Sequence, residues 1–254
     1  MTIRSIAVTA FGLSLSFLVQ RAPAQTAPLR VLVSNGVREV VQDLQPQCER
    51  AIGHPLAIQL GSTTAIQNKI AAGEQFDVAL LTTEAIGDLI KEGKVAAHSR
   101  TDMARCGIGV GVRAGAAKPD IRTPEGLKRA LRETKSISYA QDGASRVFIE
   151  QMVERMGITA DVQPKTILTQ GSVAAGENVA AGKAAIVMTL ISEILPMPGV
   201  ELVGPVPMEF QSYVNFAAGI NAKAANADAA QALIRFLTGP KAAAVYKAKG
   251  MEPR

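Results

Sequence analysis

Residues 56–82 decide the fold class, and their sequence is LAIQLGSTTAIQNKIAAGEQFDVALLT. The short apolar segment 56–60 predicts a strand, which stops at a run of glycine and hydroxyl residues. Ile66 and Ile70 stand four residues apart and mark the buried face of a helix. The apolar segment 77–81 then predicts a second strand. A strand, a helix and a strand in this order indicate a parallel sheet with a crossover helix.

The same alternation extends in both directions from this segment. Upstream, residues 29–34 predict a strand, followed by a helix that we expect to bend or restart at Pro46. Downstream, further strands are expected at 106–112, 136–140, 166–168, 184–189, 201–203 and 212–220. Helices at 229–237 and 241–249 close the chain. We therefore expect an α/β fold with mostly parallel sheets flanked by helices.

The order of elements at the end of the chain predicts two lobes. The strand at 212–220 and the terminal helices fit a chain that returns from a second lobe to the first. We place the first lobe at residues 25–106 and 217–254, and the second lobe at residues 107–216.

The first 24 residues have the three regions of a secretory signal peptide. Arg4 gives a positive start, residues 5–19 are uncharged and mostly apolar, and Ala22-Pro23-Ala24 forms a small-x-small cleavage site. The apolar run is shorter than the roughly 20 residues that a membrane-spanning helix needs. We expect residues 1–24 to be removed and the mature chain to be periplasmic.

Composition argues against several classes of protein. The hydrophobic content of 48% is typical of a globular chain and argues against disorder. Arg4 and Arg21 leave with the leader, so 25 of the 27 basic residues remain against 22 acidic ones, a net charge of +3. The basic residues are scattered and not interleaved with aromatic residues, so nucleic-acid binding has little support. The mild positive charge is compatible with an anionic ligand.

Cysteine and histidine are too few to indicate a metal centre. The chain has two of each, Cys48, Cys106, His54 and His98, and their spacing matches no recognised metal motif. We expect no metal and no cofactor. The two cysteines either pair, as the oxidising compartment allows, or are buried free thiols. Nothing in their spacing favours a bridge, so we expect free thiols.

Small polar residues follow the predicted strands in both halves of the chain. In open α/β sheets, ligands bind beyond the carboxyl ends of the strands, where backbone N–H groups and helix dipoles favour anions. The candidate ligand-binding residues at these positions are Ser34, Asn35, Gly36, Ser62, Thr63, Thr64, Thr83, Gly143, Ala144, Ser145 and Thr189. For any single position, a simple helix cap is the alternative. The repetition of the pattern favours a shared anion-binding cleft.

Arg146 is a further candidate, because it follows Ser145 directly in the first turn of a predicted helix. A cation is electrostatically misplaced at a helix N-terminus. An anionic ligand beside Arg146 would offset that cost, and an exposed arginine with a small penalty is the equal alternative.

Four stretches resemble the molybdate-binding receptors of ABC importers and, more broadly, the type 2 periplasmic binding proteins. The stretches are SNGVREVVQDL (34–44), LGSTTAIQNKIAAGEQFDVALLT (60–82), GASRVFIEQMVERMGI (143–158) and FLTGPKAAAVYKAKGMEP (236–253). The resemblance spans essentially the whole mature chain, and the second stretch is the most specific. It implies two lobes that close over a ligand, and a receptor, expected to be monomeric, that delivers a small anion to an ABC transporter permease.

The resemblance also assigns site positions. The family's first-turn serine falls at Gly36, its second-turn serine on Ser62 or Thr63, and its second-lobe tyrosine near Met188. The departures at Gly36 and Met188 leave two ligand classes open. A molybdate-like oxyanion is the family's ligand, and a small di- or tricarboxylate is the alternative, which the bidentate guanidinium of Arg146 would suit.

Two other functional classes compete with an anion receptor. A secreted enzyme would draw its acid and base groups from Asp77, Asp142 and Glu193. An adhesion or signalling module on the same fold is the third hypothesis. Since the sequence offers no nucleophile paired with a base, we expect a binding protein and not an enzyme.

Overall fold

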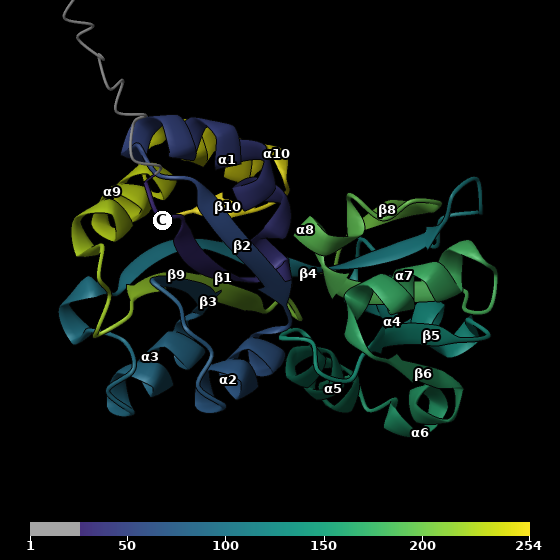
Figure 1. Ribbon diagram of the computed structural model, residues 1–254. Coiled ribbons are helices and arrows are strands. Elements are labelled where there is room, and N and C mark those ends of the chain that lie inside the picture. The colour runs from purple at the N-terminus through teal and green to yellow at the C-terminus, as the bar shows by residue number, and fades with distance from the viewer. Residues whose placement is uncertain (1–25) are drawn as a thin grey trace, which may run out of the picture.

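The computed structural model describes residues 26–254, so the signal peptide predicted over residues 1–24 lies outside the described residues. Two lobes lie side by side, each built on a twisted sheet (Figure 1). The predicted two-lobed α/β fold is confirmed. The domain boundaries placed at 106/107 and 216/217 stay a prediction.

The first lobe contains a five-stranded sheet with one further short strand. Its strands are β1 Leu29–Ser34, β2 Leu56–Gly61, β3 Val78–Thr82, β9 Tyr213–Ile220, β10 Glu252–Pro253 and the first half of β4 Thr101–Arg113. Their order is β2-β1-β3-β9-β4, and β10 pairs with β4. The strands β2, β1 and β3 are parallel, while β9 and β10 are antiparallel to their neighbours.

Helices cover both faces of this sheet. They are α1 Arg38–Ile52, α2 Thr63–Ala71, α3 Thr83–Lys91, α9 Ala227–Leu237 and α10 Pro240–Ala248, with short 3-10 turns η1 Asn35–Val37 and η2 Ala97–Ser99. In Figure 1, α1, α9 and α10 lie above the sheet, and α2 and α3 lie below it. The alternation of buried residues along β1 explains this: Val31 and Val33 pack under α1, while Leu32 packs against α2 and α3.

The second lobe repeats this architecture on a smaller scale. Its strands are β5 Ile137–Ala140, β6 Thr166–Thr169, β7 Ile186–Leu190, β8 Val200–Pro205 and the second half of β4. Strands β5, β6 and β7 are parallel, and β7 and β8 run antiparallel to β4. Its helices are α4 Pro124–Glu133, α5 Arg146–Arg155, α6 Thr159–Val162, α7 Gly171–Ala180 and α8 Ile191–Ile194, with the 3-10 turn η3 Gln163–Lys165.

The long strand β4 belongs to both sheets. Its residues 101–107 pair with β9, and its residues 108–113 pair with β7 and β8. The chain returns to the first lobe between β8 and β9. The sequence predicts a strand only at residues 106–112. The first half of β4 contains charged and polar residues, so it has no continuous apolar run that would indicate a strand.

The structure corrects the expectation at Pro46 and decides the state of the two cysteines. Helix α1 continues across Pro46 to Ile52 and ends at Gly53, where φ is 71°, so the expected restart at Pro46 is absent. The cysteines Cys48 and Cys106 are both buried free thiols, as expected. Burial raises the pKa of the Cys48 thiol to about 12, which keeps it protonated and inert.

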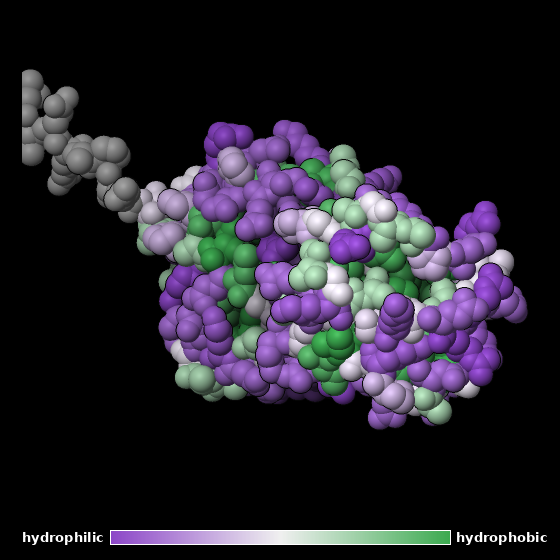
Figure 2. Space-filling model, turned by 90° about the vertical axis from the view of Figure 1, so that its right-hand side faces the viewer, coloured by the Kyte–Doolittle hydropathy of each residue, from purple (hydrophilic) through white to green (hydrophobic). Residues whose placement is uncertain are grey.

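The surface of the second-lobe end is mostly hydrophilic. Figure 2 shows purple side chains covering most of this face, with apolar groups in small separated patches. Among residues 26–254, no helix has the length and apolar character to cross a membrane.

Gly36 is required by close packing at the junction of the lobes. A Cβ atom at this position would overlap the ring of Phe216 and lie 2.9 Å from Leu190 Cδ1. Phe216 is fully buried on β9, so its ring has little room to move away. The departure from the family's serine at this position is therefore explained by the aromatic ring, which leaves no room for a side chain.

We expect Gly36→Ala to lower the free energy of unfolding by about 1–3 kcal/mol, because the added methyl group overpacks a filled site. Gly87→Ala is the matched control: Gly87 lies inside α3 with no atom within 4 Å of its Cβ position. Alanine should stabilise that helix by about 0.5–1 kcal/mol. Urea unfolding of the two variants and the parent measures both changes. Equal stability of Gly36→Ala and the parent would contradict the packing argument.

Candidate functional site

A narrow cavity lies between the two lobes at the carboxyl ends of the parallel strands. Its lining residues come from both lobes and are Ser34, Asn35, Gly36, Ser62, Thr63, Gly143, Ala144, Gly171, Ser172, Leu190 and Glu193. The cavity measures about 10 Å³, which is room for about one water molecule. The lobes therefore stand close together across it.

The first-lobe wall is made by the turns after β1 and β2. The Thr63 hydroxyl donates to Ser34 Oγ over 3.1 Å, and both side chains are buried. The Ser62 hydroxyl accepts from Ala65 N at 3.1 Å and so caps α2. Ser62 is thus the helix cap that the sequence left as an alternative, and its own hydroxyl hydrogen remains free to point elsewhere.

The second-lobe wall carries a carboxyl group held by hydroxyls. Glu193 lies in the first turn of α8, directly after β7, and is partly buried. Its Oε1 accepts a hydrogen bond from Ser172 at 3.0 Å, and its Oε2 accepts one from Thr189. Behind them, the Thr189 and Ser145 hydroxyls are 3.3 Å apart and form a further hydrogen bond. Strand β7 and helices α5, α7 and α8 therefore position one carboxyl at the cavity.

Helix N-termini give the cavity a positive potential. The first turns of α2 and α7 both contribute lining residues, and the first N–H groups of a helix have no intrahelical partner. Helix α2 belongs to the first lobe and helix α7 to the second, so an anion between their N-termini would be attracted from both sides. No lysine or arginine is among the described residues that line the cavity.

The charge state of Glu193 is unusual in this setting. Burial raises the pKa of its carboxyl above the ordinary glutamate value, while the Thr189 and Ser172 hydrogen bonds and the nearby Arg38 act in the opposite direction. Arg38 is the first residue of α1, with its side chain 25% exposed, and it pairs with Glu39 over 3.0 Å. A carboxyl with a raised pKa exchanges protons closer to neutral pH than an exposed glutamate does.

Most of the predicted binding residues come together at this cavity. Ser34, Asn35, Gly36, Ser62, Thr63, Gly143 and Ala144 line it. Ser145 and Thr189 lie just behind the wall and reach the cavity through Glu193. Thr64 lies at a second hollow of about 300 Å³ between α2, α3 and α5. Thr83 is absent from both linings, and its hydroxyl is buried without a hydrogen-bond partner among the described residues.

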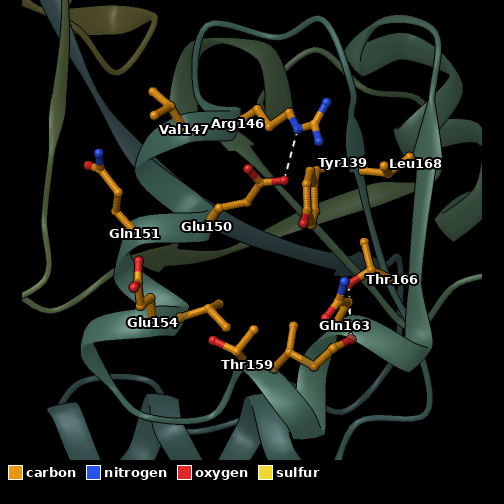
Figure 3. A pocket seen from close by; sticks show the side chains of 12 residues that line it. Tyr139, Arg146, Val147, Glu150, Gln151, Glu154, Thr159, Gln163, Thr166 and Leu168 are labelled. Carbon is orange, nitrogen blue, oxygen red and sulfur yellow. Dashed lines mark hydrogen bonds and ion pairs between the residues drawn. The ribbon is translucent and has the colours of Figure 1, made fainter.

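Arg146 occupies a different place. It lines the outer hollow of the second lobe, a recess of about 580 Å³ between α5, α6 and β6. There its Nε donates to Glu150 Oε1 at 2.8 Å (Figure 3), and its Nη1 donates to Gln141 O at 2.9 Å. A neighbouring glutamate and a carbonyl thus already offset the misplaced cation at this helix N-terminus. Arg146 does not line the cavity between the lobes.

Sequence reasoning missed four residues of the lining, Gly171, Ser172, Leu190 and Glu193. Gly171 and Ser172 follow β6 in the same way that Ser62 follows β2, so the strand-end rule would have found them. Glu193 was considered only as a generic acid or base. It follows its strand by three residues in a four-residue helix, which leaves little periodic signal.

The two other carboxyls considered for acid–base chemistry have structural roles. Asp77 lies at the amino end of β3, far from the strand ends that form the cavity, and binds Arg30 N at 2.8 Å and Arg30 Nε at 3.2 Å. Asp142 accepts from Gly171 N at 2.9 Å and so ties the turn after β5 to the start of α7. No cluster of three metal-ligating side chains occurs within residues 26–254.

The sequence pattern of one protein family matches most of the chain. This pattern, described as bacterial extracellular solute-binding protein, covers residues 29–252. In a solved structure, the periplasmic molybdate-binding protein of Azotobacter vinelandii has the same fold, with a TM-score of 0.72 over 88% of this chain and 98% of that one, at 20% identity.

The sequences of two relatives align with this chain over most of its length. An aconitate isomerase of a Pseudomonas species is 31% identical over 98% of this chain and 96% of its own. The molybdate-binding protein ModA of Azotobacter vinelandii is 29% identical over 89% of this chain and 90% of its own. The expectation that this protein is not an enzyme is wrong. The aconitate isomerase, which aligns with it over nearly the full length of both chains, is an enzyme. Sequence inspection looked for a nucleophile with a paired base, whereas a single carboxyl held by hydroxyls suffices for proton transfer.

Proposed function

The chain belongs to the bacterial extracellular solute-binding protein family, and we propose that it is an isomerase of aconitate or of a closely related small tricarboxylate. The ligand would bind between the two lobes. One observation carries the proposal: a carboxyl group, Glu193, lines the cavity in which this family is expected to hold its anion. A relative named aconitate isomerase, similar over nearly the full length of both chains, agrees with it.

The cavity suits carboxylate groups. The hydroxyl hydrogens of Ser34 and Ser62 and the first N–H groups of α2 and α7 are donors, and carboxylate oxygens are acceptors only. Hydrogen bonds to a charged partner are stronger than neutral ones. The charge of Arg38 acts on the Glu193 carboxyl, and a guanidinium can hold a carboxylate through two parallel hydrogen bonds.

Turnover would require the lobes to separate. A tricarboxylate is far larger than one water molecule, so it cannot enter a cavity of about 10 Å³. The chain passes between the lobes along β4 and again between β8 and β9. A rotation at these two crossings would open the cavity, admit the substrate and then close over it, which excludes bulk water during the reaction.

A periplasmic location fits this proposal. Family membership places the chain among extracellular solute-binding proteins, and the signal peptide predicted at residues 1–24 would export it. An enzyme in that compartment would meet organic acids before they are taken up.

A second candidate function is a receptor that delivers an anion to an ABC transporter permease. The 29% identity to a molybdate-binding protein over 89% of this chain favours it. The cavity donors would serve an oxyanion as well as a carboxylate. Glu193 is the feature that a receptor for a compact, fully ionised oxyanion does not need, since an ionised carboxylate would repel its ligand.

We expect the purified mature protein to interconvert cis- and trans-aconitate. Proton NMR separates the vinyl resonances of the two isomers, and reactions started from either isomer should reach the same equilibrium mixture. The solute receptor instead predicts stoichiometric binding without interconversion. Thermal stabilisation by molybdate and not by aconitate, with no turnover, would contradict the isomerase and support the receptor.

We expect Arg38→Ala to weaken binding of tricarballylate, the saturated and unreactive analogue of aconitate, by roughly 10–100-fold. A hydrogen-bonded ion pair with a carboxylate accounts for a loss of this size. Arg146→Ala is the matched control, because Arg146 bonds Glu150 and Gln141 in the outer hollow. Isothermal titration calorimetry of both variants gives the dissociation constants. The opposite result, in which Arg146→Ala weakens tricarballylate binding and Arg38→Ala leaves it unchanged, would place the ligand in the outer hollow.

A further inference from the structure

Glu193 is the single titratable side chain among the described residues that line the cavity. The second carboxyl near the turn, Asp142, is engaged by the backbone N–H of Gly171. The Cys106 thiol does not line the cavity, and its Sγ accepts from Ser192 N at 3.4 Å. A proton that moves to or from a ligand in this cavity therefore has one side chain to move to.

The hydrogen bonds around Glu193 fit a group that both gains and loses a proton. In the ionised state, both carboxylate oxygens accept, one from Ser172 and one from Thr189. The Thr189 hydroxyl also lies 3.3 Å from Ser145 Oγ, and either of these hydroxyls is able to donate. When Glu193 takes up a proton, Thr189 can turn its hydrogen to Ser145 and accept from the carboxyl instead. The Glu193 carboxyl therefore has hydrogen-bond partners in both its ionised and its protonated state.

The placement of Glu193 is costly for anion binding alone. A negatively charged group beside helix N-termini competes with the ligand for the same donors and repels it. Burial, which raises the pKa of Glu193, reduces this repulsion by making proton uptake easier. A raised carboxyl pKa is also what a proton-transfer catalyst near neutral pH requires.

We propose that the Glu193 carboxylate is the catalytic base and acid of the isomerisation, and that Thr189 and Ser172 are its positioning residues. This inference rests on the proposed function. Aconitate has a methylene carbon next to its carbon–carbon double bond. Glu193 removes one proton from that methylene, and the electron pair left behind forms a new double bond to the central carbon.

The original double bond opens in the same step, and its electrons accumulate on its outer carbon and the attached carboxylate. Glu193 then returns the proton to that outer carbon. No proton or electron is gained or lost overall. The new double bond forms in whichever geometry the bound carboxylates impose, so cis and trans forms interconvert. The donors at the N-termini of α2 and α7 would stabilise the negative charge that develops on the carboxylates.

The test compares Glu193→Gln with Glu150→Gln in the full mature protein. Glutamine keeps the size and one acceptor of the side chain and cannot act as a base. We expect Glu193→Gln to lower the turnover rate by roughly 100-fold or more, while the dissociation constant of tricarballylate changes by less than about fivefold, a shift of about 1 kcal/mol. Glu150→Gln removes a carboxyl that pairs with Arg146 in the outer hollow and should leave both quantities unchanged.

A pH profile separates proton transfer from a structural role. The parent should lose activity as the pH falls through the pKa of Glu193, at a pH above the ordinary range of a glutamate. The charged and titratable groups that face Glu193 are Arg38 from α1 and Cys106 from β4. Arginine stays protonated throughout, and burial raises the pKa of the Cys106 thiol, so neither produces an acidic limb.

The outcomes distinguish the inference from the proposed function. An active parent with an equally active Glu193→Gln variant overturns the role of Glu193 and leaves the isomerase intact. An inactive parent overturns the proposed function. If Glu193→Gln does not fold, Glu193→Asp replaces it, since it keeps the charge and withdraws the carboxyl by one methylene. That variant should lower kcat more than it changes KM, and unchanged values of both would also overturn the role.

Discussion

The site depends on one strand that is shared by two sheets. Strand β4 pairs with β9 in its first half and with β7 and β8 in its second half, so the two lobes meet with the carboxyl ends of their parallel strands facing one another. Each of those ends leads into a helix, and the helix dipoles converge on the same narrow cavity. The close contacts at this junction, with Gly36 against Phe216 and Leu190, explain why a side chain cannot be added there.

The sequence was sufficient for the fold because strand–helix alternation is a local signal. Residues 29–34 and 56–60 contain short apolar runs bounded by turn residues, and both became parallel strands. Ser34, Ser62, Thr63 and Gly143, which the strand-end rule selected, line one cavity, since the carboxyl ends of parallel strands share an edge; their role in ligand binding stays a prediction.

The rest of the site depended on contacts between distant residues, which one sequence does not reveal. Gly36 departs from the family's first-turn serine, and the ring of Phe216, remote in sequence, leaves no room for a side chain there. Arg146 suggested a ligand cation, and Glu150 one helical turn later satisfies it. Glu193 has no distinctive neighbours in sequence, and its position becomes informative only when Ser172 and Thr189 are seen to hold it.

The same architecture can serve binding or turnover, and on the proposed function the difference lies in one carboxyl group. Hydroxyls and helix N-termini attract an anion whatever its fate, and lobe closure excludes water in both cases. A base adds catalysis only if it faces the reacting carbon, so the proposed role requires that the hydrogen bonds from Ser172 and Thr189 hold Glu193 toward the substrate. The most direct measurement of this account is a crystal structure of the mature protein with bound tricarballylate. The account predicts the ligand between the lobes, with carboxylates at the N-termini of α2 and α7 and a methylene carbon within about 3.5 Å of a Glu193 oxygen. Ligand in the outer hollow beside Arg146, or a Glu193 carboxyl turned away from the ligand, would contradict it.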